Sequence, residues 1–558
     1  MRHYVQKLYE CIGDIVSRKL KEKADFLLSK EKGTIFKDPG GRITIALVYP
    51  NTYHVGMSNL GFQGIYGLLN SMDNVVCERA FLPGEMDFDE YVRTDTELFS
   101  LESKKPLNRF DIVAFSVSFE NDYPNIARIF NLSRLPLRSS ERNSHHPFII
   151  LGGVCTFFNP EPVADFFDIC FIGEAENMLP AFLNMYKSSA DRSELLKRSL
   201  TIQGLYVPEF YSVSYDTEGK ISERQCSEGA PHLIRTQHFD DISKSKIATT
   251  IVTTETEFSD MYLIEIMRGC PWSCRFCVAG QIYNPMRKKE LQSIEDEITI
   301  AISKTNRIGL IGPSLSDYPY IKNVLNIPGV DFSITSLRAN KKSAELVSLI
   351  KGHKSVSIAP EAGTERLRKV IHKRITEEDI LETSKLIFAE GAETLRLYFM
   401  VGLPTETMED INGIIDLVKK IKKNTSKGRI TVSISTFVPK PFTPFQWHPM
   451  EKPSEVKERL RTIKKNLLPI RGINVFHDVL KYAYMQGFFS MGDRRVSKAI
   501  EEMQKINDWR KAAEFAGLNK DFYIFRKREF EEILPWDFID SGNSKEKLWA
   551  EYQEAITL

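Results

Sequence analysis

Short apolar runs alternate with amphipathic segments in the N-terminal part of the chain. The apolar runs cover residues 43–48, 111–117, 148–151 and 168–172. Runs of this kind are typical of strands that are covered on both faces of a parallel sheet. Residues 59–69 carry apolar side chains at helical spacing, so helices are expected between the strands. The pattern predicts an α/β domain with a doubly wound, Rossmann-like parallel sheet at residues 41–190.

A second series of strands and helices follows in the middle of the chain. Six strands are expected at residues 262–266, 307–311, 331–334, 355–358, 394–400 and 430–434. Six strand–helix units in series predict a partial six-stranded (β/α)6 barrel, open on one side, at residues 259–452. In such barrels the functional side chains lie at the C-terminal ends of the strands.

Three further regions complete the expected organisation. Residues 1–40 are expected to form a helical arm, residues 191–258 a connector with short antiparallel strands, and residues 453–558 a charged helical region. Residues 438–447 are rich in proline and aromatic residues, and prolines prevent a regular strand or helix there. This run either walls a substrate cavity with its rings or packs on the barrel as a stiff linker.

Composition narrows the possible partners. The chain has 558 residues and a formal net charge of +1, so it carries no electrostatic footprint for nucleic acid, and a nucleic-acid partner is not expected. No stretch approaches the apolar length of a membrane span, and the N-terminus lacks the apolar core of a signal peptide. The sequence therefore predicts a cytoplasmic protein without a membrane partner.

Three of the eight cysteines are grouped. Cys270, Cys274 and Cys277 follow the strand at residues 262–266, where Gly269 and Pro271 force a loop. Thiolates select zinc, copper(I) or iron–sulfur clusters. A structural zinc site needs a fourth Cys or His at paired spacing, and none follows. A four-iron cluster held by three thiolates would leave one iron open for a non-protein ligand.

The other cysteines are scattered along the chain. They are Cys11, Cys77, Cys155, Cys170 and Cys226. Cysteines of cytosolic proteins are usually reduced, so these five are expected to be core residues rather than disulfide partners.

The stretch Met267–Cys277 resembles the cysteine loop of the radical S-adenosylmethionine (SAM) enzymes. The resemblance implies that Cys270, Cys274 and Cys277 hold a 4Fe–4S cluster whose open iron binds SAM, with Phe276 beside the adenine. It also implies reductive cleavage of SAM to a 5′-deoxyadenosyl radical, which removes hydrogen from an unidentified substrate. That cleavage needs a low potential, so an electron donor such as a flavodoxin or ferredoxin is expected.

Loops after the other barrel strands supply further candidates. By the resemblance, the SAM contacts are Phe276, Pro313, Ser314, Ser336, Arg338, Glu361, Gly363, Arg366 and Gly402. An arginine fork suits a carboxylate, a glutamate accepts from a hydroxyl or amine, and a glycine permits close approach. No residue is assigned a catalytic role.

The N-terminal domain has glycine-rich turns after its third and fourth predicted strands. Gly152, Gly153, Gly173 and Glu174, together with the pair Glu161-Pro162, resemble the cobalamin-binding-type domain placed before the barrel in many radical SAM enzymes. The resemblance extends over nearly the whole chain to an uncharacterised bacterial family. It implies cobalamin bound between these turns and the barrel mouth, with methyl transfer to carbon or phosphorus as the leading reaction. Without cobalamin, oxidation or rearrangement is equally expected.

The histidines bear on how cobalamin would bind. His54 follows the first predicted strand but lacks the D-x-H-x-x-G context of domains that supply a lower axial ligand. His145 and His146 precede a strand, on the wrong side of the sheet. Any cobalamin is therefore expected to bind without a protein histidine on cobalt.

Two alternatives stay open. The barrel also resembles that of tRNA methylthiotransferases, but those enzymes carry a second cysteine triad, and Cys77, Cys155 and Cys170 are far apart in the sequence. The other alternative is a non-enzymatic iron–sulfur module that senses redox state. The substrate cannot be identified from the sequence.

Overall fold

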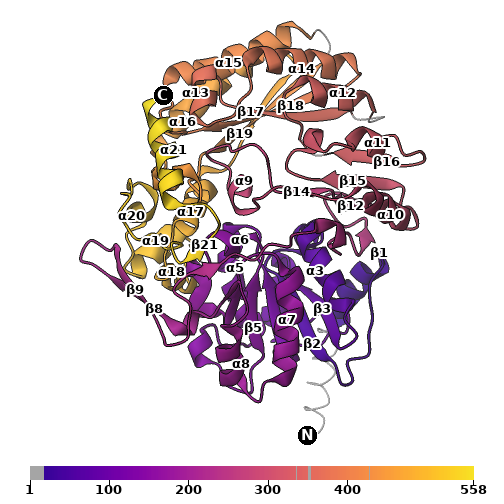
Figure 1. The fold of residues 1–558 in the computed structure, drawn as a ribbon, viewed down its shortest axis with the longest axis vertical. Coiled ribbons are helices and arrows are strands. Elements are labelled where there is room, and N and C mark those ends of the chain that lie inside the picture. The colour runs from indigo at the N-terminus through magenta and orange to yellow at the C-terminus, as the bar shows by residue number, and fades with distance from the viewer. Residues whose placement is uncertain (1–17, 335, 350–353, 426–427) are drawn as a thin grey trace.

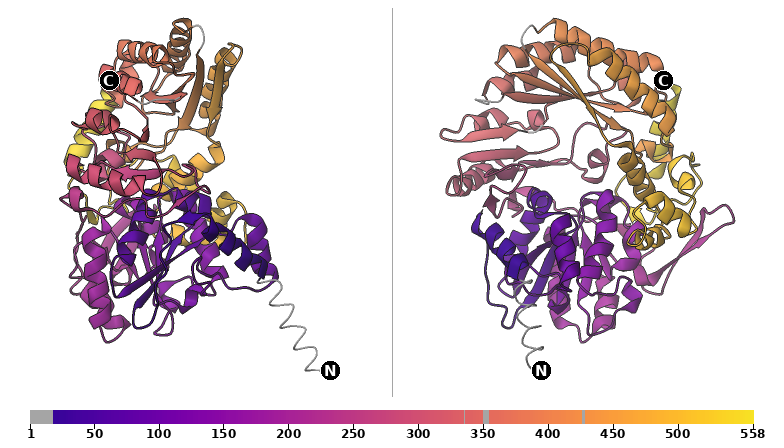
Figure 2. Two further views of the ribbon diagram at one scale, coloured as in Figure 1. Left: turned by 90° about the vertical axis from the view of Figure 1, so that its right-hand side faces the viewer. Right: turned by 180° about the vertical axis from the view of Figure 1, so that it is seen from behind.

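The computed structural model describes residues 18–334, 336–349, 354–425 and 428–558. The N-terminal domain and the barrel lie one above the other, and the C-terminal helices connect them along one side (Figure 1). The rear view in Figure 2 shows the same arrangement. Residues 1–17 of the expected N-terminal arm, Cys11 included, lie outside the described residues.

The N-terminal domain contains a six-stranded sheet in the order β3-β2-β4-β5-β6-β7. Its strands are β2 (Ile43–Tyr49), β3 (Val75–Phe81), β4 (Ile112–Ser116), β5 (Phe148–Gly152), β6 (Ile169–Phe171) and β7 (Leu205–Tyr206). The first five are parallel and β7 is antiparallel. All four predicted strands are confirmed. The strand order reverses between β2 and β4, and parallel sheets bind ligands at the carboxyl ends beside such a reversal.

Helices complete this domain. They are α2 (Tyr53–Met57), α3 (Leu60–Asn70), α4 (Glu85–Arg93), α5 (Tyr123–Leu132), α6 (Val154–Phe158), α7 (Ala175–Ser188) and α8 (Arg192–Ser199), with the 3-10 helix η4 (Glu161–Phe166).

The apolar pattern does not reveal edge strand β3, because the strand contains a buried charge. Arg79 is completely buried and donates to both Glu31 and Glu102 at 2.7 Å. A buried arginine is tolerated only when it is paired in this way. Burial at position 79 therefore depends on ion pairing, whereas the other buried positions of β3 carry apolar side chains.

Short strands join the connector to both ends of the chain. Strand β1 (Glu31–Lys32) pairs with β11 (Val252–Thr253), and β10 (Ile234–Arg235) pairs with β21 (Ile539–Asp540). Before β10 in the chain, β8 (Tyr211–Tyr215) and β9 (Ile221–Cys226) form a hairpin.

The barrel contains all six predicted strands in the predicted order. They are β12 (Tyr262–Glu265), β15 (Arg307–Ile311), β16 (Asp331–Ile334), β17 (Ser355–Glu361), β18 (Thr394–Val401) and β19 (Arg429–Thr436). A bridge from Leu337 to Ile358 joins the two groups of three. A seventh strand, β20 (Ile473–His477), adds parallel to β19, so the sheet extends beyond the expected end at residue 452.

Helices surround the outer face of the barrel sheet. They are α10 (Leu291–Ile302), α11 (Ile321–Leu325), α12 (Lys341–Leu349), α13 (Glu365–Val370), α14 (Glu377–Ala389), α15 (Met408–Lys423) and α16 (Pro453–Leu467). In β18, Leu395 and Leu397 are buried in one apolar cluster with helix residues such as Ile414. The alternate side chains point to the inner face, where Arg396 is exposed and Tyr398 is half-buried.

The C-terminal helices pack on the N-terminal domain and on the barrel. They are α17 (Leu480–Ser490), α18 (Val496–Glu502), α19 (Trp509–Phe515), α20 (Lys520–Ile524) and α21 (Lys545–Thr557). In the proline-rich run, Phe445 and Trp447 are fully buried, and the Trp447 ring lies 5.0 Å from that of Trp549. The run therefore packs as a linker. Among the helices that the structure describes, none has the length and apolar character needed to cross a membrane.

Candidate functional site

The three grouped cysteines lie on one loop at the barrel mouth. Strand β13 (Met267–Arg268) leads into the loop, which returns through α9 (Ala279–Ile282) to β14 (Arg287–Lys288). Gly269 has a φ of +80°, and a Cβ there would lie 2.5 Å from the Tyr283 carbonyl oxygen. Only glycine fits where the two arms of the loop meet, which fixes the position of Cys270 beside it.

Burial raises the pKa of all three thiols. The charge of a neighbouring cysteine of the loop also raises the pKa of each thiol, so the three sulfurs lie near one another. Metal binding needs thiolates, and nearby positive charge opposes the effect of burial. That charge comes from Arg338 at Cys270 and Cys274, and from Lys373 at Cys274 and Cys277.

The number of thiols bears on which metal centre the loop could hold. Among the described residues, no three or more His, Cys, Asp or Glu side chains come close enough together to hold a single metal ion. A four-iron cluster needs a wider arrangement, because each cysteine binds a different iron. Three thiolates are the protein donors that a four-iron cluster with one open iron would take.

Arg338 lies directly against the cysteine loop. Its guanidinium carbon is 3.7 Å from the centroid of the Trp272 ring, and its Nη2 donates to the Arg374 carbonyl oxygen at 2.8 Å. The Trp272 indole donates to Asp317 at 2.6 Å, and Ser314 donates to the same carboxylate at 2.7 Å. The structure thus brings two predicted residues, Ser314 and Arg338, together beside the cysteines.

Glu361 also lies on this side of the barrel. It has a φ of +67° at a bulge in β17, and its carboxylate accepts from Lys373 Nζ at 2.9 Å. Left-handed backbone is uncommon for a residue with a side chain, and such strain clusters at functional sites. Lys373 was not identified from the sequence because it follows helix α13 rather than a strand.

Other predicted SAM contacts are engaged within the protein. A Cβ on Gly363 would lie 2.2 Å from the Ile414 amide nitrogen, so the close approach is to helix α15 rather than to a ligand. Arg366 donates to Asp410 at 2.6 Å and to Thr405. Gly402 has a φ of +84° and donates its amide to Glu406 at 2.7 Å. Packing and turn geometry account for all three residues.

Three predicted residues remain. Pro313 lines the cavity described below, Phe276 is partly buried against the main core, and Ser336 is exposed.

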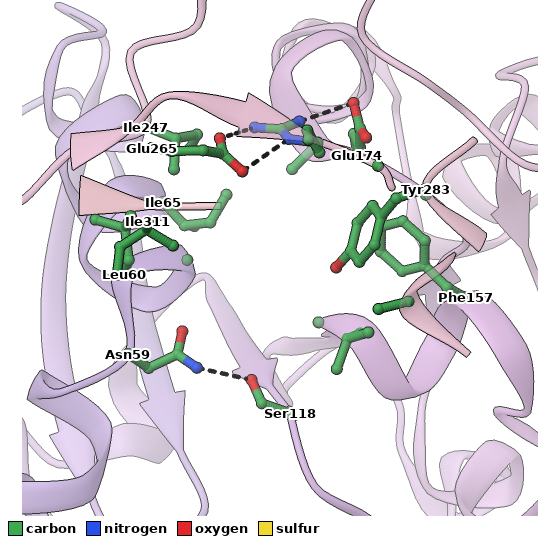
Figure 3. Close-up of a pocket in the computed structure, with 18 of the residues that line it drawn as sticks. Asn59, Leu60, Ile65, Ser118, Phe157, Glu174, Ile247, Glu265, Tyr283 and Ile311 are labelled. Carbon is green, nitrogen blue, oxygen red and sulfur yellow. Dashed lines mark hydrogen bonds and ion pairs between the residues drawn. The ribbon is translucent and has the colours of Figure 1, made fainter. Parts of the chain in front are cut away.

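A cavity of about 480 Å³ lies between the N-terminal domain and the barrel mouth. Residues Asn59, Ser118, Gly153, Phe157, Glu174, Glu265, Arg268, Gly269, Ala279, Tyr283 and Pro313 are among those that line it. Asn59 donates to Ser118 at 3.1 Å on the wall formed by the N-terminal domain, and Phe157 and Tyr283 lie together across the opening (Figure 3). The cavity therefore lies beside both the strand reversal and the cysteine loop, in the size range of small-molecule sites.

The glycines of the two predicted glycine-rich turns have a different cause. Gly153 has a φ of +99°, and a Cβ there would lie 2.4 Å from the Val117 carbonyl oxygen. Gly173 has a φ of +125°, and its Cβ would lie 2.3 Å from the Gln237 carbonyl oxygen. A Cβ on Gly152 would lie 4.0 Å from the Phe115 carbonyl oxygen, so that position has room for one. Gly153 and Gly173 allow neighbouring backbone to approach closely, so they are not evidence for a ring ligand.

Glu174 joins the two domains. Its carboxylate forms ion pairs with Arg268 at 2.7 Å and Arg287 at 2.8 Å, both from the barrel. Burial raises the pKa of Glu174, but His238 and these two arginines more than compensate and hold that pKa well below its usual range. Glu174 forms a charged wall of the cavity, and its expected contact with cobalamin stays a prediction.

Glu161 has a similar joining role. It accepts from Tyr206 at 2.6 Å and from Arg224 and Arg494 at 3.0 and 3.2 Å. Burial raises its pKa, yet the two arginines lower it to about 2. The Glu161-Pro162 pair thus anchors the hairpin and the C-terminal helices to the N-terminal domain.

Asp122 is a titratable group that sequence reasoning missed. It accepts from Asn51 at 2.8 Å, beside the strand reversal, and burial raises its pKa to about 7. Asn51 and Asp122 each lie a few residues beyond a predicted strand. That placement is the signal that could have identified them.

The scattered cysteines mostly behave as expected. Cys77, Cys155 and Cys170 are buried in the N-terminal domain, and burial raises the pKa of each well above its usual value. Cys226 differs, because it is only partly buried and its sulfur lies 3.3 Å from His232 Nδ1.

Comparison with known proteins identifies the family. A family model described as the radical SAM superfamily matches residues 264–418, and one described as the N-terminal region of radical SAM proteins matches residues 61–208. An uncharacterized protein of Methanocaldococcus jannaschii is 30% identical, over 82% of this chain and 90% of its own. The chain belongs to the radical SAM superfamily. Enzymes of this superfamily use a 4Fe–4S cluster and SAM, in agreement with the cysteine loop.

Other similar proteins match less of the chain or match it less closely. The tRNA-2-methylthio-N(6)-dimethylallyladenosine synthase of Ehrlichia canis is 25% identical, over 37% of this chain and 49% of its own. A solved structure of the cobalamin-dependent SAM radical enzyme OxsB with aqua-cobalamin and SAM bound is 13% identical, with a TM-score of 0.48, over 92% of this chain and 80% of that one. A likeness at this level bears on neither the ligand nor the reaction.

Proposed function

We propose that this radical SAM enzyme holds its 4Fe–4S cluster with Cys270, Cys274 and Cys277 and binds SAM at the barrel mouth. The observation that carries the proposal is a loop of three adjacent thiols with the Arg338 guanidinium stacked against it. When bound, the cluster and SAM supply a carbon radical that removes hydrogen from an unreactive C–H bond.

The residues around the loop have separate roles in this proposal. The Arg338 fork, supported by Trp272, offers charged donors to the SAM carboxylate. Glu361, which is paired with Lys373, accepts from an amine or hydroxyl of SAM. The inner face of the barrel receives the substrate, because Arg396 and Tyr398 are accessible there and no protein partner is described for the Arg396 guanidinium.

A second candidate function, cobalamin-dependent methyl transfer, is favoured by the cavity. Its lining includes Leu60, Ile65, Val154, Phe157 and Tyr283, which fit the faces of a flat macrocycle, and its position beside the cysteine loop would bring both cofactors together. No histidine is among the described residues that line it. Cobalamin here would therefore lack a protein imidazole on cobalt.

The methylthiotransferase alternative has less support. It requires a second cluster in the N-terminal domain, and Cys77, Cys155 and Cys170 are each buried there among apolar side chains. The alternative of a non-enzymatic redox module leaves the Arg338 and Glu361 arrangement without a role.

Anaerobic reconstitution tests the main proposal. The wild-type protein is expected to bind about four irons per chain. After reduction with dithionite it should convert SAM to 5′-deoxyadenosine, slowly, even without substrate. Replacing all three cysteines of the loop with Ala should abolish both properties, whereas Cys226→Ala should retain them. Four irons in the triple variant would refute the cluster assignment.

Cobalt content tests the second candidate. Protein produced with hydroxocobalamin should retain one cobalt per chain, and Phe157→Glu, which places a charge in the cavity wall, should lose it. The electron paramagnetic resonance spectrum of the cobalt(II) state should show no splitting from a histidine nitrogen. His54→Ala should therefore leave that spectrum unchanged. Absence of cobalt from the wild type would exclude cobalamin-dependent chemistry and leave the main proposal intact.

A further inference from the structure

The inner face of strands β17 to β20 carries a row of polar side chains. The strand register places Ser357, Arg396, Thr431 and Asn474 side by side, one from each strand. The positions before and after each of them are buried in the apolar core beneath the helices, so these four side chains point to the inner face. None of the four residues is buried. Neighbouring strands lie about 4.8 Å apart, so the side chains form one continuous polar row.

Arg396 carries the charge of this row. Within the part of the chain that the structure describes, its guanidinium makes no hydrogen bond, ion pair or ring contact. The nearest acid along the chain, Glu393, is paired with Lys354 and Arg429, each at 3.6 Å. A guanidinium that has no internal partner and lies among hydroxyl and amide groups offers a fork to a carboxylate or a phosphate.

The next row on the inner face carries two aromatic rings. Tyr398, Ser433 and Phe476 lie side by side across β18, β19 and β20. Phe476 is 61% exposed and Tyr398 is half-buried. Neither ring contacts another ring of the described residues. The inner face therefore offers open aromatic surface directly beside the unpaired arginine.

Further exposed apolar side chains lead from this row to the cavity. Tyr482, in the first turn of α17, is 52% exposed, and its carbonyl oxygen accepts from Asn121 of the N-terminal domain at 3.2 Å. Phe119, two residues before Asn121, is 43% exposed. Its neighbour Ser118 lines the cavity beside the cysteine loop. Exposed apolar side chains that are grouped in this way, rather than scattered, mark binding sites.

We propose that the substrate is a small molecule with a flat aromatic ring and an anionic group, either a carboxylate or a phosphate. The ring lies against Phe476 and Tyr482, and Arg396 binds the anion. This inference rests on the proposed function, which places the substrate on the inner face, and it adds the chemical class. Arg396 lies five residues before the end of β18, about 16 Å at 3.3 Å per residue. The anion is therefore bound far from the cysteine loop, and the carbon that loses hydrogen belongs to the other end of the substrate.

Binding of defined probes tests the class. Saturation-transfer NMR is recorded on the reconstituted, oxidised protein with SAM present, so that the SAM site is filled and no cleavage occurs. Two ring-bearing anions, indole-3-butyrate and 2-naphthyl phosphate, are each compared with a neutral partner, indole-3-butyramide and 2-naphthol. The wild type should bind at least one anion roughly tenfold to a hundredfold more tightly than its neutral partner, because a charged hydrogen bond is gained. The pair with the larger difference distinguishes carboxylate from phosphate.

Variants locate the two parts of the site. Arg396→Gln should remove the difference between each anion and its neutral partner. Phe476→Ser/Tyr482→Ser should weaken the binding of all four probes roughly twofold to tenfold, because the ring contacts are lost. Arg461→Gln, at an exposed arginine of α16, removes the same charge elsewhere and should retain the difference. Iron content after reconstitution reports whether each variant is folded.

Several results would overturn the inference. They are a wild type that binds neither anion, equal affinity for charged and neutral probes, or a difference that survives Arg396→Gln. Self-association of the chain that Phe476→Ser/Tyr482→Ser abolishes would assign the rings to a second copy and overturn it too. The assay needs no SAM cleavage, so the two proposals fail separately. A wild type that converts SAM but does not distinguish the probes refutes only this inference, whereas one that binds the anions but converts no SAM with dithionite refutes the proposed function.

Discussion

The two parallel sheets of this protein both end in loops that face one cavity, but they use those loops differently. At the edge of the N-terminal domain, Gly153, Gly173 and Glu174 each meet another part of the protein. At the barrel mouth, the three thiols gather beside the Arg338 guanidinium, which stacks on the ring of Trp272 in the cysteine loop. A glycine-rich turn at a sheet edge shows that something approaches the backbone. It does not show whether that is a ligand or the chain itself.

The largest effect that separates the two edges is expected at Glu174. Glu174→Gln leaves Arg268 and Arg287 buried with reduced pairing, and breaking a buried pair costs about 3–5 kcal/mol. The free energy of unfolding in urea should fall by this amount while iron content on reconstitution is retained. A stable variant that has lost only ligand binding would instead give Glu174 a cofactor role.

Gly153→Ala sharpens the same comparison. The new Cβ would lie 2.4 Å from the Val117 oxygen at a left-handed φ, so a loss of about 2–3 kcal/mol is expected. Gly152→Ala, at the preceding residue, places its Cβ 4.0 Å from the Phe115 carbonyl oxygen and should change the unfolding free energy little. Equal stability of the two variants would show that Gly153 is kept for a ligand.

At the barrel mouth the expected effect is on binding. Arg338→Gln removes a charged donor and should weaken SAM binding by roughly tenfold to a hundredfold, because charged hydrogen bonds are worth about 1.5–3 kcal/mol. Calorimetry on the reconstituted, oxidised protein measures this. Arg366→Gln is the control, since Arg366 is tied to Asp410 and Thr405. Similar SAM affinity in both variants would place SAM elsewhere.

The smallest effect concerns pH at the strand reversal. Burial raises the pKa of Asp122 to about 7 from 3.8, so the folded state favours the protonated form. Stability from this group is therefore present below pH 4 and is lost as pH rises to about 7. The free energy of unfolding then falls by at most about 1.4 kcal/mol for each pH unit across that range. Asp122→Asn should remove this slope from unfolding free energies measured between pH 4 and 8; an unchanged slope would assign it to another group.

Much of this architecture could be predicted because its elements repeat simple patterns. The ten predicted strands and the position of the cysteine loop follow from apolar runs and from the residues that end them. Strand β3 was not predicted because Arg79, within it, is buried as an ion pair. Strand β20 was not predicted because only Ile473 and Val475 of its five residues are buried. Lys373 was not predicted because it follows helix α13 rather than a strand. Partners of this kind depend on three-dimensional packing that no local pattern encodes.

The central claim is that the cysteine loop holds a cluster with one iron open to SAM. Electron paramagnetic resonance of the reconstituted, dithionite-reduced protein, recorded with and without SAM, tests it most directly. We expect a reduced-cluster signal that changes shape when SAM is added, and no such signal in the variant with Ala at positions 270, 274 and 277. A signal that SAM leaves unchanged, or one that survives in the triple variant, would contradict the account.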